Sequence, residues 1–549
     1  MPLQKNQVLT LQVERLSSDG SGVAHSPEGE TVFIPGAAPG DEARVRIVKD
    51  CKRYAFGILD EVLTPSPDRI PVDCAVAGPC GGCSLRHLDY AAELRAKQEN
   101  VADAFARIGG LDVPVLPIVG SPEIDRYRNK VQFPVGTDKA GRPCIGFYAG
   151  RTHRIVPCPD CRLQPGVLNE IGNTLCAFFA EKGIHPYNEE TGKGLVRHIF
   201  LRRGAHSGQI MVCLVSTRAK LPSAEELCTR LKEAFPDIVT ILLNVNAKNT
   251  NVILGSETHT LYGQGYIEDT LCGVPVQLGP LSFYQVNTLA AEQLYGIAAE
   301  YAQLTSDDLL LDLYCGMGTI GLSMADHCRE LVGVEIVPEA IESAKANAAR
   351  MGAAVSAKSR FFCADAGQAA AQLAAEGLHP DVVMLDPPRK GCDEATLSAV
   401  VRMAPRRVVY VSCNPATAAR DAAWLEQNGY HAEKVQPVDL FPRTKHVETV
   451  CLLSKLNVKH HIEVEITMDE LDLTAAESKA TYDEIKAYVL EKFGFKVSQL
   501  YIAQIKRKCG IIERKNYNQS KKEDAKVPKC PPEKEAAIMD ALKHFQMIP

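Results

Sequence analysis

The chain has 549 residues, enough for three or four domains of about 150 residues each. Hydrophobic residues make up 46% and charged residues 23%, as in an ordinary globular protein, and no apolar run reaches the about 20 residues that span a membrane. The first residues lack the apolar core of a signal peptide, so we expect a cytoplasmic protein with no membrane partner. The net charge of −6 argues against non-specific polyanion binding, so a nucleic-acid partner would need local basic patches.

Residues 1–64 are predicted to form a small β-barrel of the OB type. Glycine-rich turns separate five short alternating runs, at residues 8–13, 20–24, 31–35, 42–47 and 55–59. The sequence of Gly20–Ala24 followed by that of Val32–Asp41 resembles a TRAM domain, an RNA-binding barrel found on RNA-modifying enzymes. The alternative is a barrel that serves only as a scaffold.

A cysteine cluster follows the barrel. The chain has 19 cysteines, which in the cytoplasm are more often thiols, metal ligands or catalysts than disulfides. Cys74, Cys80 and Cys83 have the spacing C-x5-C-x2-C, with glycines between the last two. Three thiolates so close together fit zinc or an iron–sulfur cluster, each of which needs a fourth ligand. Cys158 and Cys161 are candidates for it, and spacing alone leaves the metal open.

Residues 65–283 are predicted to form a central α+β domain. A helix at about residues 86–112 ends at Gly109-Gly110 and is a candidate to pack on the domain that follows. Two basic segments, Arg126–Lys130 and Arg197–Arg203, are interleaved with aromatic residues and suit contacts to phosphates and bases. Solvated surface is the alternative for both segments.

From about residue 305 the chain alternates strands and helices. The apolar run 309–313 leads into a glycine loop, where the backbone can approach a ligand closely. The next three predicted strands end at or near Glu335, Asp365 and Asp386, so these acids are expected to line a ligand crevice at one edge of a parallel sheet.

Asp312 narrows the choice of ligand for this crevice. A dinucleotide-binding dehydrogenase is the obvious rival, but the loop lacks the order G-x-G-x-x-G, and a carboxylate on the preceding strand would repel a pyrophosphate. The same carboxylate suits the amino group of S-adenosylmethionine (SAM).

Three motifs stand at the ends of later apolar runs. They are Asp-Pro-Pro-Arg-Lys-Gly from Asp386, Ser-Cys-Asn-Pro around Cys413 and His-Val-Glu-Thr around Glu448. A carboxylate, a cysteine in a turn and a glutamate in this order are typical of a covalent base-modifying site.

Together with Phe283–Asn287 and the loop Asp312–Gly318, these motifs closely resemble the uracil-C5 RNA methyltransferases, in particular the branch with a TRAM domain and an iron–sulfur cluster that modifies 23S rRNA. The resemblance covers about residues 5–455. It implies a Rossmann-like, SAM-dependent catalytic domain over residues 284–456, SAM and a 4Fe–4S cluster as cofactors, and C5 methylation of uridine in 23S rRNA.

The resemblance also implies roles for single residues. Cys413 would add to carbon 6 of uracil, Glu448 would remove the proton from carbon 5, and Asp386 would contact both SAM and the target base. Phe283 would stack near the extruded base. The implied SAM contacts are Gln285, Tyr314, Glu335, Asp365 and Asp386, and the implied cluster ligands are Cys74, Cys80, Cys83 and Cys161, with Cys158 as the runner-up to Cys161.

Two other functions stay open. The first is the same reaction on tRNA, although relatives specialised for tRNA generally lack the barrel and the cluster. The second is a catalytically silent RNA-binding or ribosome-assembly factor, against which the joint presence of Cys413, Glu448 and Asp386 speaks. No obligate protein partner is evident.

The chain departs from this family in two places. Thr319 stands where relatives often carry asparagine. Residues 457–549 form an extension of unknown role, with the apolar spacing of a short α/β module and a basic stretch from Lys506 to Lys529. The extension could grip RNA, bind a partner or be a weakly ordered tail.

Overall fold

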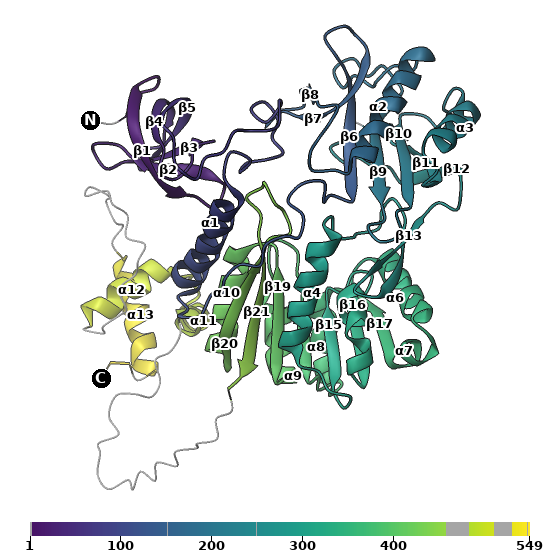
Figure 1. The fold of residues 1–549 in the computed structure, drawn as a ribbon. Coiled ribbons are helices and arrows are strands. Elements are labelled where there is room, and N and C mark those ends of the chain that lie inside the picture. The colour runs from purple at the N-terminus through teal and green to yellow at the C-terminus, as the bar shows by residue number, and fades with distance from the viewer. Residues whose placement is uncertain are drawn as a thin grey trace. The chain divides into compact units, whose positions relative to one another are not determined.

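The computed structural model describes residues 3–150, 152–248, 250–456, 482–509, 530–545 and 547–548. The chain divides into two compact units, Met1–Asn457 and Val458–Pro549 (Figure 1). Within the described residues, no helix is both long enough and apolar enough to cross a membrane.

The N-terminal strands form a closed barrel. They are β1 (Val8–Leu16), β2 (Ser21–His25), β3 (Thr31–Pro35), β4 (Glu42–Asp50) and β5 (Tyr54–Thr64). The strand order is β1-β2-β3-β5-β4, and antiparallel pairing of β1 with β4 closes the ring. Alternate side chains such as Val32, Ile34, Val45 and Ile47 point inward and are fully buried. The predicted barrel is confirmed.

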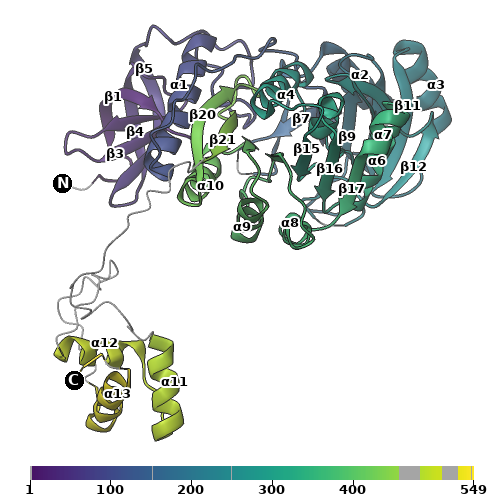
Figure 2. The same cartoon turned by 90° about the horizontal axis from the view of Figure 1, so that it is seen from below.

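A long helix follows the barrel and the cysteine segment. Helix α1 (Tyr90–Asp103) continues as a π-helix over Ala104–Gly109. Val101 and Phe105 are buried in an apolar core that also includes residues of α10 (Pro415–Gln427). Helix α1 and its π-helical continuation thus pack on α10 in the C-terminal part of the first unit (Figure 2).

A mixed seven-stranded sheet forms the middle of the first unit. Its strand order is β12-β11-β10-β9-β6-β7-β8, and the following strands β13 and β14 pair as a hairpin. Helices α2 and α3 share an apolar core with the sheet. The elements are β6 (Lys130–Thr137), β7 (Pro143–Tyr148), β8 (Ile155–Pro157), α2 (Gly166–Glu181), β9 (Val196–Arg203), β10 (Ile210–Ser216), α3 (Ala224–Ala234), β11 (Ile238–Val245), β12 (Glu257–Tyr262), β13 (Ile267–Leu271) and β14 (Val274–Leu278).

Two arginines expected to contact RNA are buried inside this middle part. Arg197 Nη1 donates a hydrogen bond to the carbonyl oxygen of Lys248 at 2.6 Å. Arg202 Nη2 donates to the carbonyl oxygen of Ser282 at 2.7 Å. The prediction of RNA contact is wrong for these two residues, because their buried guanidinium groups connect segments of the fold.

A second seven-stranded sheet forms the C-terminal part of the first unit. Its order is β17-β16-β15-β18-β19-β21-β20; the first five strands are parallel, and β21 is antiparallel to both neighbours. The strands are β15 (Leu309–Leu313), β16 (Glu330–Glu335), β17 (Ser359–Cys363), β18 (Val382–Leu385), β19 (Arg407–Ser412), β20 (Tyr430–Val438) and β21 (Glu448–Lys455).

Helices cover both faces of this second sheet. Leu310 belongs to the core shared with α4, whereas its neighbour Leu311 belongs to the core shared with α8, α9 and α10. Residues of one strand thus alternate between two cores, as expected for the middle layer of a Rossmann-like fold. The remaining helices are α4 (Thr288–Ala302), α5 (Thr319–Ser323), a 3-10 turn (Ala325–His327), α6 (Pro338–Arg350), α7 (Ala353–Lys358), α8 (Ala366–Ala375) and α9 (Glu394–Met403).

The described part of the second unit is helical. Helices α11 (Tyr482–Phe493), α12 (Gln499–Lys508) and α13 (Pro532–His544) share an apolar core that includes Val489 and Ile538. The described residues of this unit contain no strand, so they do not show the expected α/β module. Residues 457–481 and 510–529, which hold most of the basic stretch, lie outside the described residues.

Candidate active site

One edge of the second sheet brings together the three residues expected to be catalytic. Asp386 follows β18 and Cys413 follows β19, so both lie where parallel strands end. Strand β21 runs the opposite way, and its second residue, Thr449, pairs with Ser412 at the end of β19. Glu448, the first residue of β21, therefore lies at the same edge as Cys413.

The two carboxyl groups of this edge titrate close to neutral pH. Glu448 is 4% exposed, and burial together with the nearby Asp386 carboxylate raises its pKa to about 8, against a smaller opposing effect of Arg389. Burial alone raises the pKa of Asp386 to about 7. Each group can therefore exchange a proton at neutral pH, the property that acid–base chemistry needs.

Cys413 is held in a tight turn that opens helix α10. The Asn414 N–H donates to Ser412 Oγ at 3.1 Å, and Asn414 Oδ1 caps the helix by accepting from the Ala416 N–H at 3.2 Å. Burial and the nearby Glu448 carboxylate raise the thiol pKa, whereas the Arg389 guanidinium lowers it through charge and a hydrogen bond. Arg389 is thus the group that favours the thiolate.

Cys413 opens into a pocket of about 500 Å³. The pocket is electropositive, because its lining has the cations Arg15, Arg107, Arg389 and Lys445 and one carboxylate, Asp103. Burial, and to a smaller extent the neighbouring cations, lower the pKa of His446 to about 4. Barrel, helix α1 and second sheet all contribute to its lining, which is Arg15, Ser17, Ser18, Asn100, Asp103, Ala104, Arg107, Ile108, Arg389, Cys413, Asn414, Pro415, Ala416, Lys445, His446 and Val447. This composition suits a polyanion threaded toward the cysteine.

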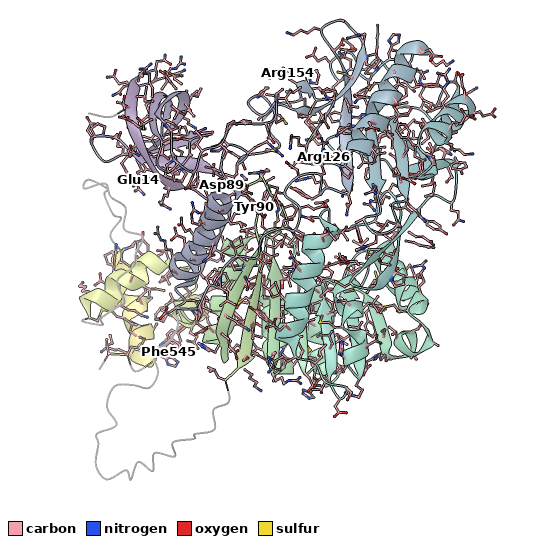
Figure 3. The ribbon with its side chains drawn as sticks, viewed as in Figure 1. Glu14, Asp89, Tyr90, Arg126, Arg154 and Phe545 are labelled. Atoms are coloured by element: carbon pink, nitrogen blue, oxygen red, sulfur yellow. The ribbon has the colours of Figure 1, made fainter. Side chains whose placement is uncertain are left out.

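A buried ion network fixes the loop between β20 and β21, which precedes Glu448. Lys97 Nζ on α1 donates to Glu93 Oε1 and to Asp439 Oδ1, both at 2.7 Å. The Tyr90 hydroxyl, labelled in Figure 3, donates to Asp439 Oδ2 at 3.0 Å, and the Arg443 N–H donates to Glu93 Oε1 at 2.8 Å. Helix α1 therefore holds the loop that carries Lys445 and His446.

A second group of residues lies at the ends of β15 and β16. Asp312 Oδ2 accepts from the Gly321 N–H at 3.0 Å, while Oδ1 is buried without a partner. Burial raises the pKa of Asp312 to about 8. Glu335 accepts from the Gly316 N–H at 3.2 Å and from the Val337 N–H at 2.9 Å, which orients its carboxylate beside the glycine loop.

The glycine loop itself is shaped for close approach. Tyr314, Gly316 and Gly318 all have positive φ, at 65°, 56° and 80°. A Cβ at Gly316 would meet no atom within 4 Å, so this side of the loop borders open space. The unpartnered Asp312 oxygen and the open loop fit SAM, whose ammonium group needs an acceptor.

Two of the expected SAM contacts, Asp365 and Gln285, form hydrogen bonds that hold their own segments in place. Asp365 is exposed and caps α8, with Oδ1 accepting from the N–H groups of Gly367 (3.1 Å) and Gln368 (3.2 Å). Gln285 is half-buried, and its backbone oxygen accepts from Asn129 Nδ2 at 2.8 Å. Both residues lie on segments that are firmly anchored.

The segment around Phe283 is held on both sides, by Arg202 bound to the Ser282 carbonyl oxygen before it and by Tyr284 and Asn287 after it, while the Phe283 ring is exposed. The Tyr284 hydroxyl donates to Asp269 Oδ2 at 3.0 Å, and Asn287 Nδ2 donates to the Leu440 carbonyl oxygen at 3.1 Å. The side chain of Phe283 is 70% exposed. An exposed ring on an anchored segment is what base stacking requires.

The expected metal ligands line one small pocket. The pocket measures about 180 Å³ and is lined by five cysteines and three arginines, namely Cys74, Cys80, Cys83, Cys158, Cys161, Arg86, Arg128 and Arg162, among others. The Cys158 thiol donates to Cys161, which lowers the pKa of Cys161 to about 7. Within the described residues, no three Cys, His, Asp or Glu side chains are arranged to hold one metal ion.

Sequence reasoning missed Arg389, Lys445 and Arg107, which all line the Cys413 pocket. Arg389 and Lys445 lie within or beside motifs that had been singled out, so a signal for them existed. Arg107 belongs to the π-helix, and its place beside Cys413 depends on how α1 packs on α10.

Two family models match the chain. Residues 2–59 match the TRAM domain, and residues 243–456 match the tRNA (Uracil-5-)-methyltransferase model. An RNA methyltransferase of Halalkalibacterium halodurans, described as uncharacterized, is 43% identical over 457 residues, which are 83% of this chain and 99% of that protein. One from Clostridium tetani is 41% identical over 454 residues, 83% of this chain and 98% of the other.

A solved structure extends the likeness to three dimensions. The Pyrococcus abyssi tRNA (uracil-54, C5)-methyltransferase, in complex with S-adenosyl-L-homocysteine, is 27% identical, with a TM-score of 0.65. The match covers 81% of this chain and 100% of that chain. Sequence and fold agree: the chain belongs to the SAM-dependent RNA uracil-C5 methyltransferases that carry an N-terminal TRAM domain.

Proposed function

We propose that this protein methylates carbon 5 of a uridine in 23S rRNA through a covalent bond between Cys413 and carbon 6 of the base. The observation that carries the proposal is the meeting of Cys413, Glu448 and Asp386 at one edge of the sheet, where Asp386 raises the pKa of Glu448 and both carboxylates raise the pKa of Cys413. Family membership supports uracil-C5 chemistry on RNA. The covalent step and the choice of 23S rRNA are not given by family membership and belong to the proposal.

Cys413 starts the reaction, because carbon 5 of uracil is a poor nucleophile. The thiolate forms a bond to carbon 6, and the electron pair of the C5–C6 double bond moves into an enolate. Arg389 stabilises the thiolate form. SAM supplies the methyl group, which carbon 5 takes from the sulfonium.

Glu448 completes the reaction. After transfer, carbon 5 carries a proton and a methyl group; the Glu448 carboxylate takes the proton, the double bond forms again and the Cys413 thiolate leaves. With a pKa of about 8, this carboxylate is a much stronger base than an exposed glutamate. Asp386, with a pKa of about 7, can donate or accept a hydrogen bond, which suits contact with the base and SAM.

The remaining assignments concern binding. We assign Glu335 to the ribose hydroxyls of SAM, Asp365 to its adenine, and Gln285 and Tyr314 to further SAM contacts. Phe283 stacks near the extruded base; unchanged RNA affinity and turnover in Phe283→Leu would remove that role. The proposed domains are residues 1–64, 65–283, 284–456 and the extension 457–549.

A specific observation favours tRNA as the second candidate substrate. The Pyrococcus abyssi protein is described as a tRNA (uracil-54, C5)-methyltransferase, and its structure matches 81% of this chain and all of its own chain. The extent of this match supports tRNA as the alternative substrate. The cysteine cluster remains the argument for 23S rRNA.

Methyl transfer to both RNAs tests the function. Unmodified 23S rRNA and unmodified tRNA are incubated with the protein and methyl-labelled SAM, with Cys413→Ala as the control. We expect label on carbon 5 of uridine in 23S rRNA only, and none with Cys413→Ala. Label on tRNA alone would move the proposal to the second candidate, and full activity of Cys413→Ala would exclude the covalent step.

We also propose a 4Fe–4S cluster on Cys74, Cys80, Cys83 and Cys161. The proposal is supported by the family resemblance and by the five cysteines that line one pocket of about 180 Å³. Cys161 is preferred over Cys158, because Cys158 donates its thiol proton to Cys161 and so favours the Cys161 thiolate.

Anaerobic purification tests the cluster. We expect a brown protein with visible absorbance that Cys161→Ser removes and Cys158→Ser retains. A colourless preparation containing zinc would refute this choice of metal, and the opposite response of the two variants would exchange the fourth ligand.

A further inference from the structure

The outer face of the barrel carries an aromatic trio, which we define as Phe33, Tyr54 and Phe56. Their ring centroids are 5.7 to 5.8 Å apart. Strands β3 and β5 pair in parallel with Phe33 opposite Phe56. Because side chains alternate along a strand, the neighbours Val32 and Ala55 fill the barrel interior and the trio points outward.

The trio is accessible and is not needed to fill the core. Tyr54 is 41% exposed, and Phe33 and Phe56 are half-buried. Tyr54 meets the other two rings edge-on, at interplanar angles of 78° and 87°. None of the three lines the Cys413 pocket. Three clustered rings on an outer barrel face form an apolar surface for which the methylation chemistry has no use.

Exposed cations without ion-pair partners surround the trio. Lys49 lies opposite Phe56 in the β4–β5 ladder, and Lys52 and Arg53 directly precede Tyr54. Across the described part of the chain, these three make no ion pair. By contrast, two arginines earlier in β4 form ion pairs with carboxylates on β5, Arg44 with Glu61 and Arg46 with Asp60. Aromatic rings can stack on the bases of a single-stranded nucleic acid, and the unpaired cations beside them can contact its phosphates.

We propose that the aromatic trio is a stacking platform for unpaired bases of the RNA substrate, with Lys49, Lys52 and Arg53 contacting the flanking phosphates. Every base has a π-face, so the platform selects single strands over duplex and has little sequence preference. It adds a contact outside the pocket where the target uridine reacts. The proposal rests on the proposed function only in taking RNA as the substrate.

Binding of a fluorescein-labelled oligouridine of about 12 nucleotides to the full-length protein, measured by fluorescence anisotropy, tests the platform. We expect Tyr54→Leu to weaken binding about tenfold, and Tyr54→Trp, which keeps an aromatic face, to retain it. The double variant Lys52→Ala/Arg53→Ala should lower the slope of log Kd against log salt by about 1.4. Ile58→Ala changes a side chain that is 51% exposed on the same strand and should have no effect.

Several results would overturn the platform. They are equal affinity of Tyr54→Leu and wild type, equal losses in Tyr54→Leu and Tyr54→Trp, and binding of a duplex hairpin as tight as that of oligouridine. Methyl transfer by the same wild-type preparation separates this inference from the proposed function. If the wild-type protein is active and Tyr54→Leu binds oligouridine as tightly as wild type, the platform alone is excluded. If the wild-type protein methylates neither RNA, the proposed function alone is excluded.

Discussion

At the scale of single residues, the active site depends on carboxyl groups that the protein keeps out of water. Asp386 is close enough to Glu448 for its negative charge to add to the effect of burial and raise the pKa of Glu448, so at neutral pH Glu448 favours holding a proton. The same carboxylates raise the pKa of Cys413. Before RNA and SAM bind, Glu448 and Cys413 therefore favour their protonated forms. Hydrogen bonds from the RNA and the positive charge of SAM would favour the ionised forms that react.

Replacing Glu448 by glutamine should stop the reaction after methyl transfer. Without a base, the C5 proton stays and Cys413 cannot leave, so turnover falls at least about 100-fold while a methylated protein–RNA adduct accumulates. The adduct is measured as a labelled band that survives denaturing electrophoresis. Glu433→Gln, an exposed carboxyl on β20, is the matched control. Normal turnover without adduct in Glu448→Gln would contradict the assignment.

The reaction should accelerate as pH rises. The active form of Glu448 is the carboxylate, and with a pKa of about 8 this form is lost as pH falls. The Cys413 thiolate, disfavoured by its raised pKa, is lost in the same direction. Single-turnover rates between about pH 6 and about pH 9 should fall by more than about tenfold per pH unit on the acid side of pH 8, because both groups lose their active form there. A flat profile would mean that another group is the base.

At the scale of elements, helix α1 and the β20–β21 loop are joined by charges with almost no access to water. Lys97, Glu93 and Asp439 are each at most 1% exposed. Lys97→Met removes the ammonium group shared by the buried Glu93 and Asp439 carboxylates, of which Glu93 keeps an ion pair with Arg443 at 3.7 Å, and should destabilise the protein by about 3–5 kcal/mol. Thermal unfolding measures the loss. Lys345→Met, which breaks the exposed pair with Glu342, should cost less than about 1 kcal/mol; a similar loss in both variants would exclude a special role for the buried network.

Sequence periodicity predicted the strands and helices better than it predicted the contacts between segments that are distant in the chain. The acids at the ends of β16, β17 and β18 were expected at one sheet edge because parallel strands end together. The bond between Lys97 and Asp439 joins residues 342 positions apart, and no local pattern indicates such a pair. Arg202 looked like an RNA contact for the same reason: a charged residue in a strand shows its burial only when the rest of the sheet is known.

At the scale of the whole molecule, the chain has two units with separate apolar cores. The core of α11, α12 and α13 contains only residues of the second unit. A protein that ends at Asn457 should therefore keep its melting temperature and its kcat and KM on 23S rRNA within about twofold. Thermal unfolding and steady-state methyl transfer provide the comparison. A rise in KM with unchanged kcat would instead assign RNA binding to the extension.

Glu448 is placed in the site by the antiparallel pairing of β21 with β19. The ladder between β19 and β21 sets the spacing of the base from the nucleophile, because Thr449 is locked opposite Ser412. A slip of one residue in this ladder would bring Val447 or Thr449 to the position of Glu448 and turn the carboxylate to the other face of the sheet. Activity can thus be lost through pairing alone, in a chain whose catalytic side chains are all unchanged.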